Sequence, residues 1–186
     1  MLMLQRFFIS SGYSVFVALA WTALWHLNDF FFNAAEVTPL VSLIFIPAVL
    51  RPVAVLLFGV PGAVGLILGA AVTITTVGPI SFPLILIILS NGLIALGSLT
   101  LMRQIPSYRA ELTADMAGLS LRTIITFAGL TALASTTTSS LIFSLSPTLS
   151  WTSGLSLSML VGDAVGALLM LYLLSIFSPA ISKYLR

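Results

Sequence analysis

The chain has 186 residues, of which 59% are hydrophobic and 6% are charged. Soluble domains carry roughly a quarter charged residues because water must wet their surface, so this composition excludes an ordinary soluble domain and indicates a surface that faces lipid. Seven Lys and Arg residues against five Asp and Glu residues give a net charge of +2, too little for a nucleic-acid-binding surface. The absence of cysteine excludes disulfides, thiol catalysis and cysteine-ligated metals.

Six apolar segments approach the length of about 20 residues that a membrane-spanning helix needs. We therefore expect an all-α transmembrane bundle that forms a single membrane domain, residues 1–186. A polar segment, residues 107–117, is expected to be a short amphipathic helix on the cytoplasmic face, either a solvated connector or a docking surface. The expected spanning helices cover residues 7–25, 38–58, 61–77, 82–102, 120–143 and 154–177.

The basic residues predict the orientation of the chain, because Lys and Arg in short loops mark the cytoplasmic side of a membrane. With six spans, one side holds no Lys or Arg but does hold Asp29 and Glu36. We therefore expect both termini in the cytoplasm and a multi-pass location in the bacterial inner membrane. The other side then holds Arg6, Arg103, Arg109, Arg122, Lys183 and Arg186.

Two charged residues, Arg51 and Asp163, lie near the middle of expected helices. A charge at the bilayer centre costs at least about 2.5–3.5 kcal/mol, so such residues usually face the protein interior and pair. At about 1.5 Å per residue, Arg51 falls about 4 Å from the centre and Asp163 about 3 Å on the other side. We predict an Arg51–Asp163 ion pair that lines a ligand or signal site. The alternatives are a purely structural pair, or an Arg51 side chain that extends to the interface alone.

Three further residues add to this hypothesis. Asn91 offers donors and an acceptor inside the fourth helix, for a ligand or for a helix–helix hydrogen bond. Pro47 and Pro52 flank Arg51, and each removes a helical hydrogen bond. They predict a kink beside Arg51, where freed carbonyls face either a polar pocket or packed neighbours.

Two pairs of glycines have the four-residue spacing that lets helices approach closely. Gly65 and Gly69 lie on the expected third helix, and Gly162 and Gly166 lie on the sixth. The second pair encloses Asp163, so we expect it to press that residue against a neighbour.

The sequence contains no recognised catalytic motif: no Walker loop, GxSxG or HExxH, and no paired carboxylates inside the membrane. His26, Asp29 and Glu36 lie close in sequence, but their spacing fits no recognised metal site. We expect a non-enzymatic protein without metal or cofactor. Aromatic residues nearby are typical of an outer interfacial belt: Phe30–Phe32, Trp21, Trp25 and Trp151.

Several short motifs resemble the first class of bacterial membrane-associated sensor (MASE) domains. They are Phe45-Ile-Pro-Ala48, Leu56-Leu-Phe-Gly59, Asn91-Gly-Leu-Ile-Ala95, Leu101-Met-Arg103 and Leu160-Val-Gly-Asp-Ala-Val-Gly166. Those domains usually precede cytoplasmic histidine-kinase or diguanylate-cyclase modules. The resemblance, over about residues 37–177, implies a short stand-alone sensor that reports through another protein.

Two other classes of function stay open. The length and the glycine- and alanine-rich helices also look like the substrate-binding subunit of an energy-coupling-factor vitamin transporter. Such subunits dock through small residues of the first helix, but Ala18, Ala20 and Ala23 lack the usual four-residue spacing. A structural accessory subunit of a larger membrane complex is the third class. The expected partners are the lipid bilayer and a membrane or cytoplasmic protein, and no nucleic acid.

Overall fold

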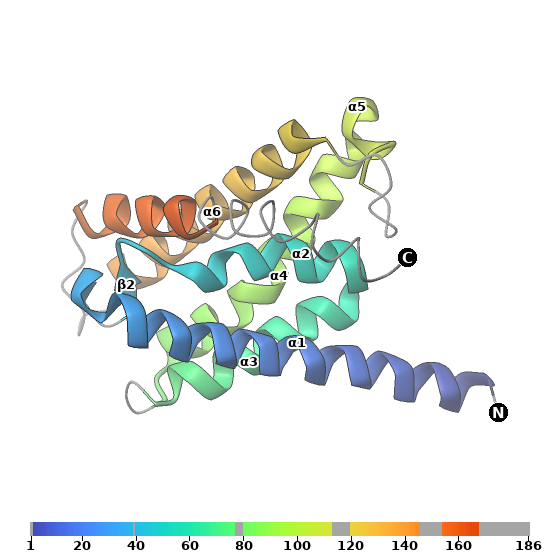
Figure 1. Cartoon of the computed structure of the whole chain (residues 1–186), viewed down its shortest axis with the longest axis horizontal. Helices are drawn as coiled ribbons and strands as arrows, with labels where there is room; N and C mark the ends of the chain where they lie inside the picture. The colour runs from blue at the N-terminus through green and yellow to red at the C-terminus, as the bar shows by residue number, and fades with distance from the viewer. Residues whose placement is uncertain (1, 39, 77–79, 113–119, 146–153, 168–186) are drawn as a thin grey trace, which may run out of the picture.

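A computed structural model describes residues 2–38, 40–76, 80–112, 120–145 and 154–167. The described chain is almost entirely helical, which confirms the all-α class, and it includes one small β-hairpin (Figure 1). In chain order the elements are α1 (Leu2–Phe32), the 3-10 helix η1 (Asn33–Ala35), β1 (Glu36–Thr38), β2 (Val41–Ser42), the 3-10 helix η2 (Ile46–Val49), α2 (Leu50–Phe58), α3 (Val60–Ile74), α4 (Phe82–Gln104), α5 (Pro106–Arg109), α6 (Leu121–Ser144) and a helix over Gly154–Ala167.

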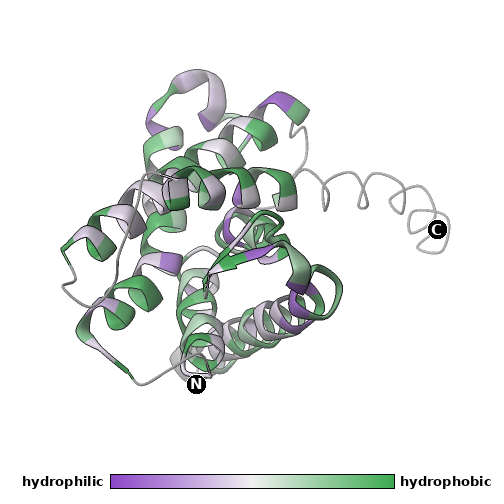
Figure 2. Ribbon diagram, turned by 90° about the vertical axis from the view of Figure 1, so that its left-hand side faces the viewer, coloured by the Kyte–Doolittle hydropathy of each residue, from purple (hydrophilic) through white to green (hydrophobic). Residues whose placement is uncertain are grey.

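Hydrophobic residues dominate the helical ribbons (Figure 2), and many large ones are exposed on the surface of the bundle. On α1, Phe16 and Leu19 are 61% and 66% exposed, whereas Arg51 and Asp163 are buried. Soluble proteins show the opposite arrangement of large apolar and charged side chains. Within the described residues, three helices are long and apolar enough to cross a bilayer: Phe8–Ala35, Phe82–Gln104 and Leu121–Ser144. The chain is therefore a membrane protein.

Successive long segments run back and forth between two ends of the bundle. The N-terminal end of α1, the α2–α3 turn and α5 lie at one end, and the hairpin and the start of α4 lie at the other (Figure 1). Helix α1 packs on α3, α3 on α4, and α4 on α6. Their shared core holds large buried side chains, including Trp21, Leu66, Leu99 and Phe127.

The expected helix over residues 38–58 is wrong in its first half. The chain forms the antiparallel β1–β2 hairpin, stays non-helical to Phe45, and becomes helical only at Ile46. Pro47 lies in the first turn of η2, where a missing N–H costs little. Pro52 has no N–H for the carbonyl of Ala48, so α2 begins only at Leu50. The two prolines therefore mark the start of this helical segment, and the predicted kink within a longer helix is incorrect.

The other expected helices are close to the observed ones. Helix α1 extends beyond residues 7–25 at both ends, and α3 occupies Val60–Ile74 where residues 61–77 were expected. Helices α4 and α6 agree with 82–102 and 120–143 to within two residues. Residues 168–177 of the sixth helix lie outside the described part. Of the amphipathic segment 107–117, the described part shows the single turn of α5, and residues 113–117 are likewise outside.

Candidate functional site

Arg51 lies in the first turn of α2 with only 4% of its surface exposed. Its Nη1 donates a hydrogen bond to Asp163 Oδ2 at 2.6 Å, which completes an ion pair with the helix Gly154–Ala167. Its Nε donates to Asn91 Oδ1 of α4 at 3.1 Å. The predicted ion pair is therefore present, and all three predicted site residues meet at one buried point.

Asn91 has a fixed orientation in this centre. Its Nδ2 donates to the carbonyl of Ile87 at 2.9 Å, so its Oδ1 is the atom turned toward Arg51. A buried ion pair is tolerable when its remaining polar atoms are also satisfied. The asparagine oxygen does this for one polar atom of the guanidinium, the Nε of Arg51.

Two aromatic rings lie close to the guanidinium of Arg51. The Cζ atom of Arg51 lies 5.6 Å from the ring centre of Trp21 and 5.5 Å from that of Phe45, within cation–π range. Trp21 also donates from Nε1 to Thr73 Oγ1 at 3.1 Å. Trp21 is thus 1% exposed in the core, not part of an outer belt as expected. Trp151 lies outside the described residues.

The glycines beside Asp163 contact an extended segment of chain rather than another helix. A Cβ atom added to Gly162 would overlap the carbonyl oxygen of Ser42, and one added to Gly166 would overlap that of Phe45. The amide of Phe45 donates to the carbonyl of Gly162 at 3.0 Å. The expectation that this pair presses Asp163 against a neighbour is confirmed, and the neighbour is the segment that leads into Arg51.

The sequence reasoning missed Asn28. This residue is 8% exposed, and its Oδ1 accepts a hydrogen bond from the amide of Ile46 at 2.8 Å, where η2 begins. Irregular backbone inside a membrane protein requires such partners. The available signal was periodicity, because Trp21, Trp25 and Asn28 share one face of α1.

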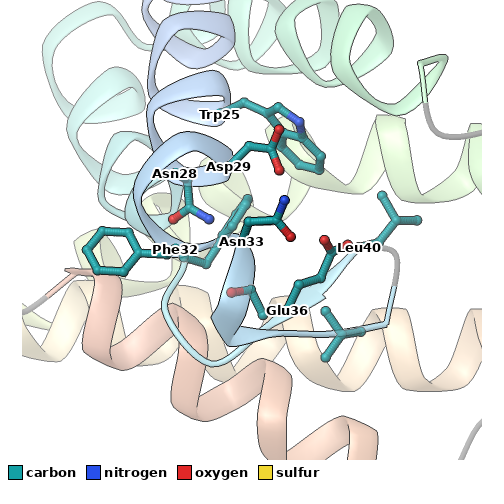
Figure 3. Close-up of a pocket in the computed structure, with 10 residues that line it drawn as sticks. Trp25, Asn28, Asp29, Phe32, Asn33, Glu36 and Leu40 are labelled. Carbon is teal, nitrogen blue, oxygen red and sulfur yellow. The ribbon is translucent and has the colours of Figure 1, made fainter.

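Two neighbouring pockets lie beside the Arg51 centre. The inner pocket has a volume of about 40 Å³, room for roughly three water molecules, and Arg51, Asn91 and Asp163 border it. The outer pocket, of about 50 Å³, lies where α1 passes into the hairpin (Figure 3). Four residues line both pockets: Trp25, Leu40, Ser42 and Phe45.

The residues considered for a metal do not gather. Asp29 and Glu36 line the outer pocket, and His26 is not among the residues that line either pocket. Across the described part of the chain, no three His, Cys, Asp or Glu side chains cluster in a way that would hold a metal ion.

A second carboxylate, that of Glu111, organises the opposite end of the bundle. Its Oε2 accepts hydrogen bonds from Ser120 Oγ at 2.6 Å, from Thr123 Oγ1 at 2.5 Å and from the Ser120 amide at 3.1 Å. These donors lower the pKa of Glu111 below its ordinary value, with the Ser120 hydroxyl the largest cause. Arg103 Nη2 donates to the Leu112 carbonyl at 3.0 Å. The described ends of this connection, Glu111–Leu112 and Ser120, are therefore held by hydrogen bonds, and its role as a solvated connector or a docking surface stays a prediction.

Comparison with family models, curated proteins and solved structures finds no match. The geometry of the site therefore carries the functional conclusion.

The inner pocket offers hydrogen bonding and electrostatic contact. Arg51 Nη2 and Asp163 Oδ1 bond to no described residue, and neither is fully enclosed. Both side chains border the pocket, where a guanidinium offers hydrogen-bond donors and a carboxylate offers acceptors. Such an arrangement can hold a small molecule.

Proposed function

We propose that this protein is a non-catalytic, sensor-like ligand-binding module of the bacterial inner membrane that acts through a partner protein. Its binding site is the inner pocket beside Arg51, Asn91 and Asp163. The observation that carries the proposal is a buried charged centre that borders a pocket: Arg51 Nη2 and Asp163 Oδ1 bond to no described residue, and both side chains line the pocket. Ionisable residues inside membrane proteins mark functional sites by default.

The extended segment before α2 supports the same proposal over a purely structural ion pair. A pair that only fixed the helix register would need neither an extended segment nor a pocket beside it. Here the described chain before η2 is non-helical from Glu36 to Phe45, and Arg51 follows in the first turn of α2. Non-helical backbone at membrane depth is tolerated where it is buried in protein or lines a water-filled cavity.

We propose six membrane crossings with both termini in the cytoplasm. Helix ends bearing Arg103, Arg109 and Arg122 lie at the same end of the bundle as the N-terminus, and Asp29 and Glu36 belong to the other end (Figure 1). Because the chain lacks cysteine, single introduced thiols report sidedness directly. In intact cells a membrane-impermeant maleimide should label Asn33→Cys and leave Ser107→Cys unlabelled. The reverse pattern would contradict the orientation.

The decisive experiment replaces the ion pair by apolar residues of similar size, Arg51→Met with Asp163→Leu. Such replacements of buried pairs are often neutral or stabilising, so the double variant should fold. Native mass spectrometry after mild detergent extraction should show a small bound molecule on the wild-type protein and none on the double variant.

Other outcomes separate the alternatives. If the double variant retains the bound molecule and all partners, the pair is structural only. A wild-type protein that carries no small molecule but copurifies with a large complex would indicate an accessory subunit. Copurification with an ATPase and a vitamin would indicate the transporter subunit.

A further inference from the structure

We propose that the outer and inner pockets form one binding path for a small organic cation, an amine or quaternary ammonium compound. This inference rests on the proposed function and names the ligand class of the same site.

The two pockets adjoin and share part of their walls. Trp25, Leu40, Ser42 and Phe45 line both of them, so a molecule in the outer pocket touches side chains that also border the Arg51 centre. Leu40 and Ser42 come from the hairpin, and Trp25 comes from α1. The hairpin and the last turns of α1 thus lie beside the site and border the approach to it.

The charge of the combined lining favours a cation. Three carboxylates, those of Asp29, Glu36 and Asp163, face one guanidinium, that of Arg51. Arg51 and Asp163 neutralise each other's charge in the ion pair. The carboxylates of Asp29 and Glu36 have no ion-pair or hydrogen-bond partner in the described part of the chain. Two unneutralised carboxylates at one opening attract cations and repel anions.

The outer pocket combines these carboxylates with aromatic and amide groups. In Figure 3 Asp29 lies beside the indole of Trp25, and Asn33 and Glu36 lie below them in that view, all lining the same pocket. The rings of Trp25 and Phe45 meet edge to face at 5.7 Å. Aromatic faces bind ammonium groups through cation–π attraction, whereas no three His, Cys, Asp or Glu side chains gather to hold a metal ion among the described residues.

The inner end of the path supplies an independent reason to expect a ligand. Asp163 is 1% exposed, yet its Oδ1 bonds to no described residue, and the Nη2 of Arg51 is in the same position. The carboxylate of Asp163 can therefore accept, and the guanidinium of Arg51 can donate, a further hydrogen bond to a molecule in the inner pocket. An ammonium compound with a hydroxyl or carbonyl oxygen satisfies both, and the pocket volume of about 40 Å³ restricts it to a small one.

Intrinsic tryptophan fluorescence reports occupancy, because Trp25 lines both pockets and Trp21 lines the inner one. The full-length protein in lipid nanodiscs would be titrated with ethanolamine hydrochloride and with tetramethylammonium chloride, against sodium chloride at equal ionic strength. A saturable change with an organic cation, absent with sodium, is the expected result. Asp29→Asn and Glu36→Gln should each weaken binding by about tenfold, since each removes one charged contact.

Glu111→Gln is the matched control, because it removes the same charge outside both pockets; it should leave the titration unchanged. The inference is overturned if no organic cation gives a saturable change, if calcium chloride gives the stronger response, or if Glu111→Gln weakens binding as much as Asp29→Asn does. If organic cations fail while the double apolar variant still loses another bound molecule, the ligand class is wrong and the proposed function stands. Failure of both experiments rejects both proposals.

Discussion

The two glycine pairs have the same spacing and pack against different kinds of neighbour. Gly65 and Gly69 bring α3 against α1, where a Cβ atom added to Gly69 would lie 2.7 Å from the Cβ of Trp21. Gly162 and Gly166 bring their helix against the backbone carbonyls of an extended segment. Each contact is accompanied by a polar link between two side chains: Trp21 to Thr73 in the first, and Asp163 to Arg51 in the second.

The difference explains why only one of the two contacts forms a candidate site. Two helices in contact fill the space between them with side chains, and the first contact is indeed part of the core. An extended segment presents its backbone to the helix and projects its side chains elsewhere. At the second contact this arrangement leaves a pocket that Ser42, Phe45 and Asp163 help to line.

The largest expected effect is at the charged link. Asp163→Ala leaves the guanidinium of Arg51 buried without its counterion, which should lower the free energy of unfolding by about 3–5 kcal/mol. Unfolding in mixed micelles titrated with SDS measures this loss. Adding Arg51→Met to the same chain should restore most of it. A loss below about 1 kcal/mol for Asp163→Ala would show that the pair does not stabilise the bundle as a buried pair does.

Glycine-to-alanine substitutions compare the two contacts directly. Gly162→Ala places a methyl group on the carbonyl oxygen of Ser42 and should cost about 1–3 kcal/mol. Gly69→Ala should cost less, because its closest contacts overlap less severely. Gly97→Ala is the control, since no other group lies within 4 Å of the added carbon. It should gain up to about 1 kcal/mol from helix propensity. Equal losses at Gly162 and Gly97 would contradict the close contact.

Removal of the neutral link should have a smaller effect than removal of the charged one. Trp21→Phe deletes the hydrogen bond to Thr73 and should lower the unfolding free energy by about 1 kcal/mol. The loss is limited because the Thr73 hydroxyl keeps its bond to the carbonyl of Gly69 at 3.1 Å. The same SDS titration measures it. A loss as large as that of Asp163→Ala would indicate that the contact of the indole ring with Arg51 stabilises the fold more than the hydrogen bond from Trp21 to Thr73 does.

The sequence predicted the parts that depend on composition and on the cost of isolated charges. Long apolar runs located α4 and α6, and the two lone charges in apolar surroundings predicted the ion pair. It did not predict the extended segment before η2. A short run of apolar residues, such as the one that contains Val41 and Ile44, fits a buried helix and a buried extended chain equally well. What decides between them is a partner distant in sequence, the Asn28 side chain that bonds to Ile46.

Acidification tests a carboxylate that belongs to neither glycine contact and has the smallest expected effect. In the folded chain the pKa of Glu111 is lowered from 4.5, because Ser120 and Thr123 donate hydrogen bonds to the ionised form. A group whose folded pKa is lowered stabilises the fold above its unfolded pKa, and that stabilisation disappears as the pH falls through the folded value. Below about pH 4.5 the start of α6 should therefore loosen.

Amide exchange protection at Thr123 and Ile124 measures this local opening, and Glu111→Gln should remove its pH dependence. Protection around Gly69 should stay constant over the same range, because the close contacts there involve Trp21 and Thr73 and no carboxylate. If that region lost protection together with α6, the two parts of the bundle would be coupled more tightly than their separate hydrogen-bond networks indicate.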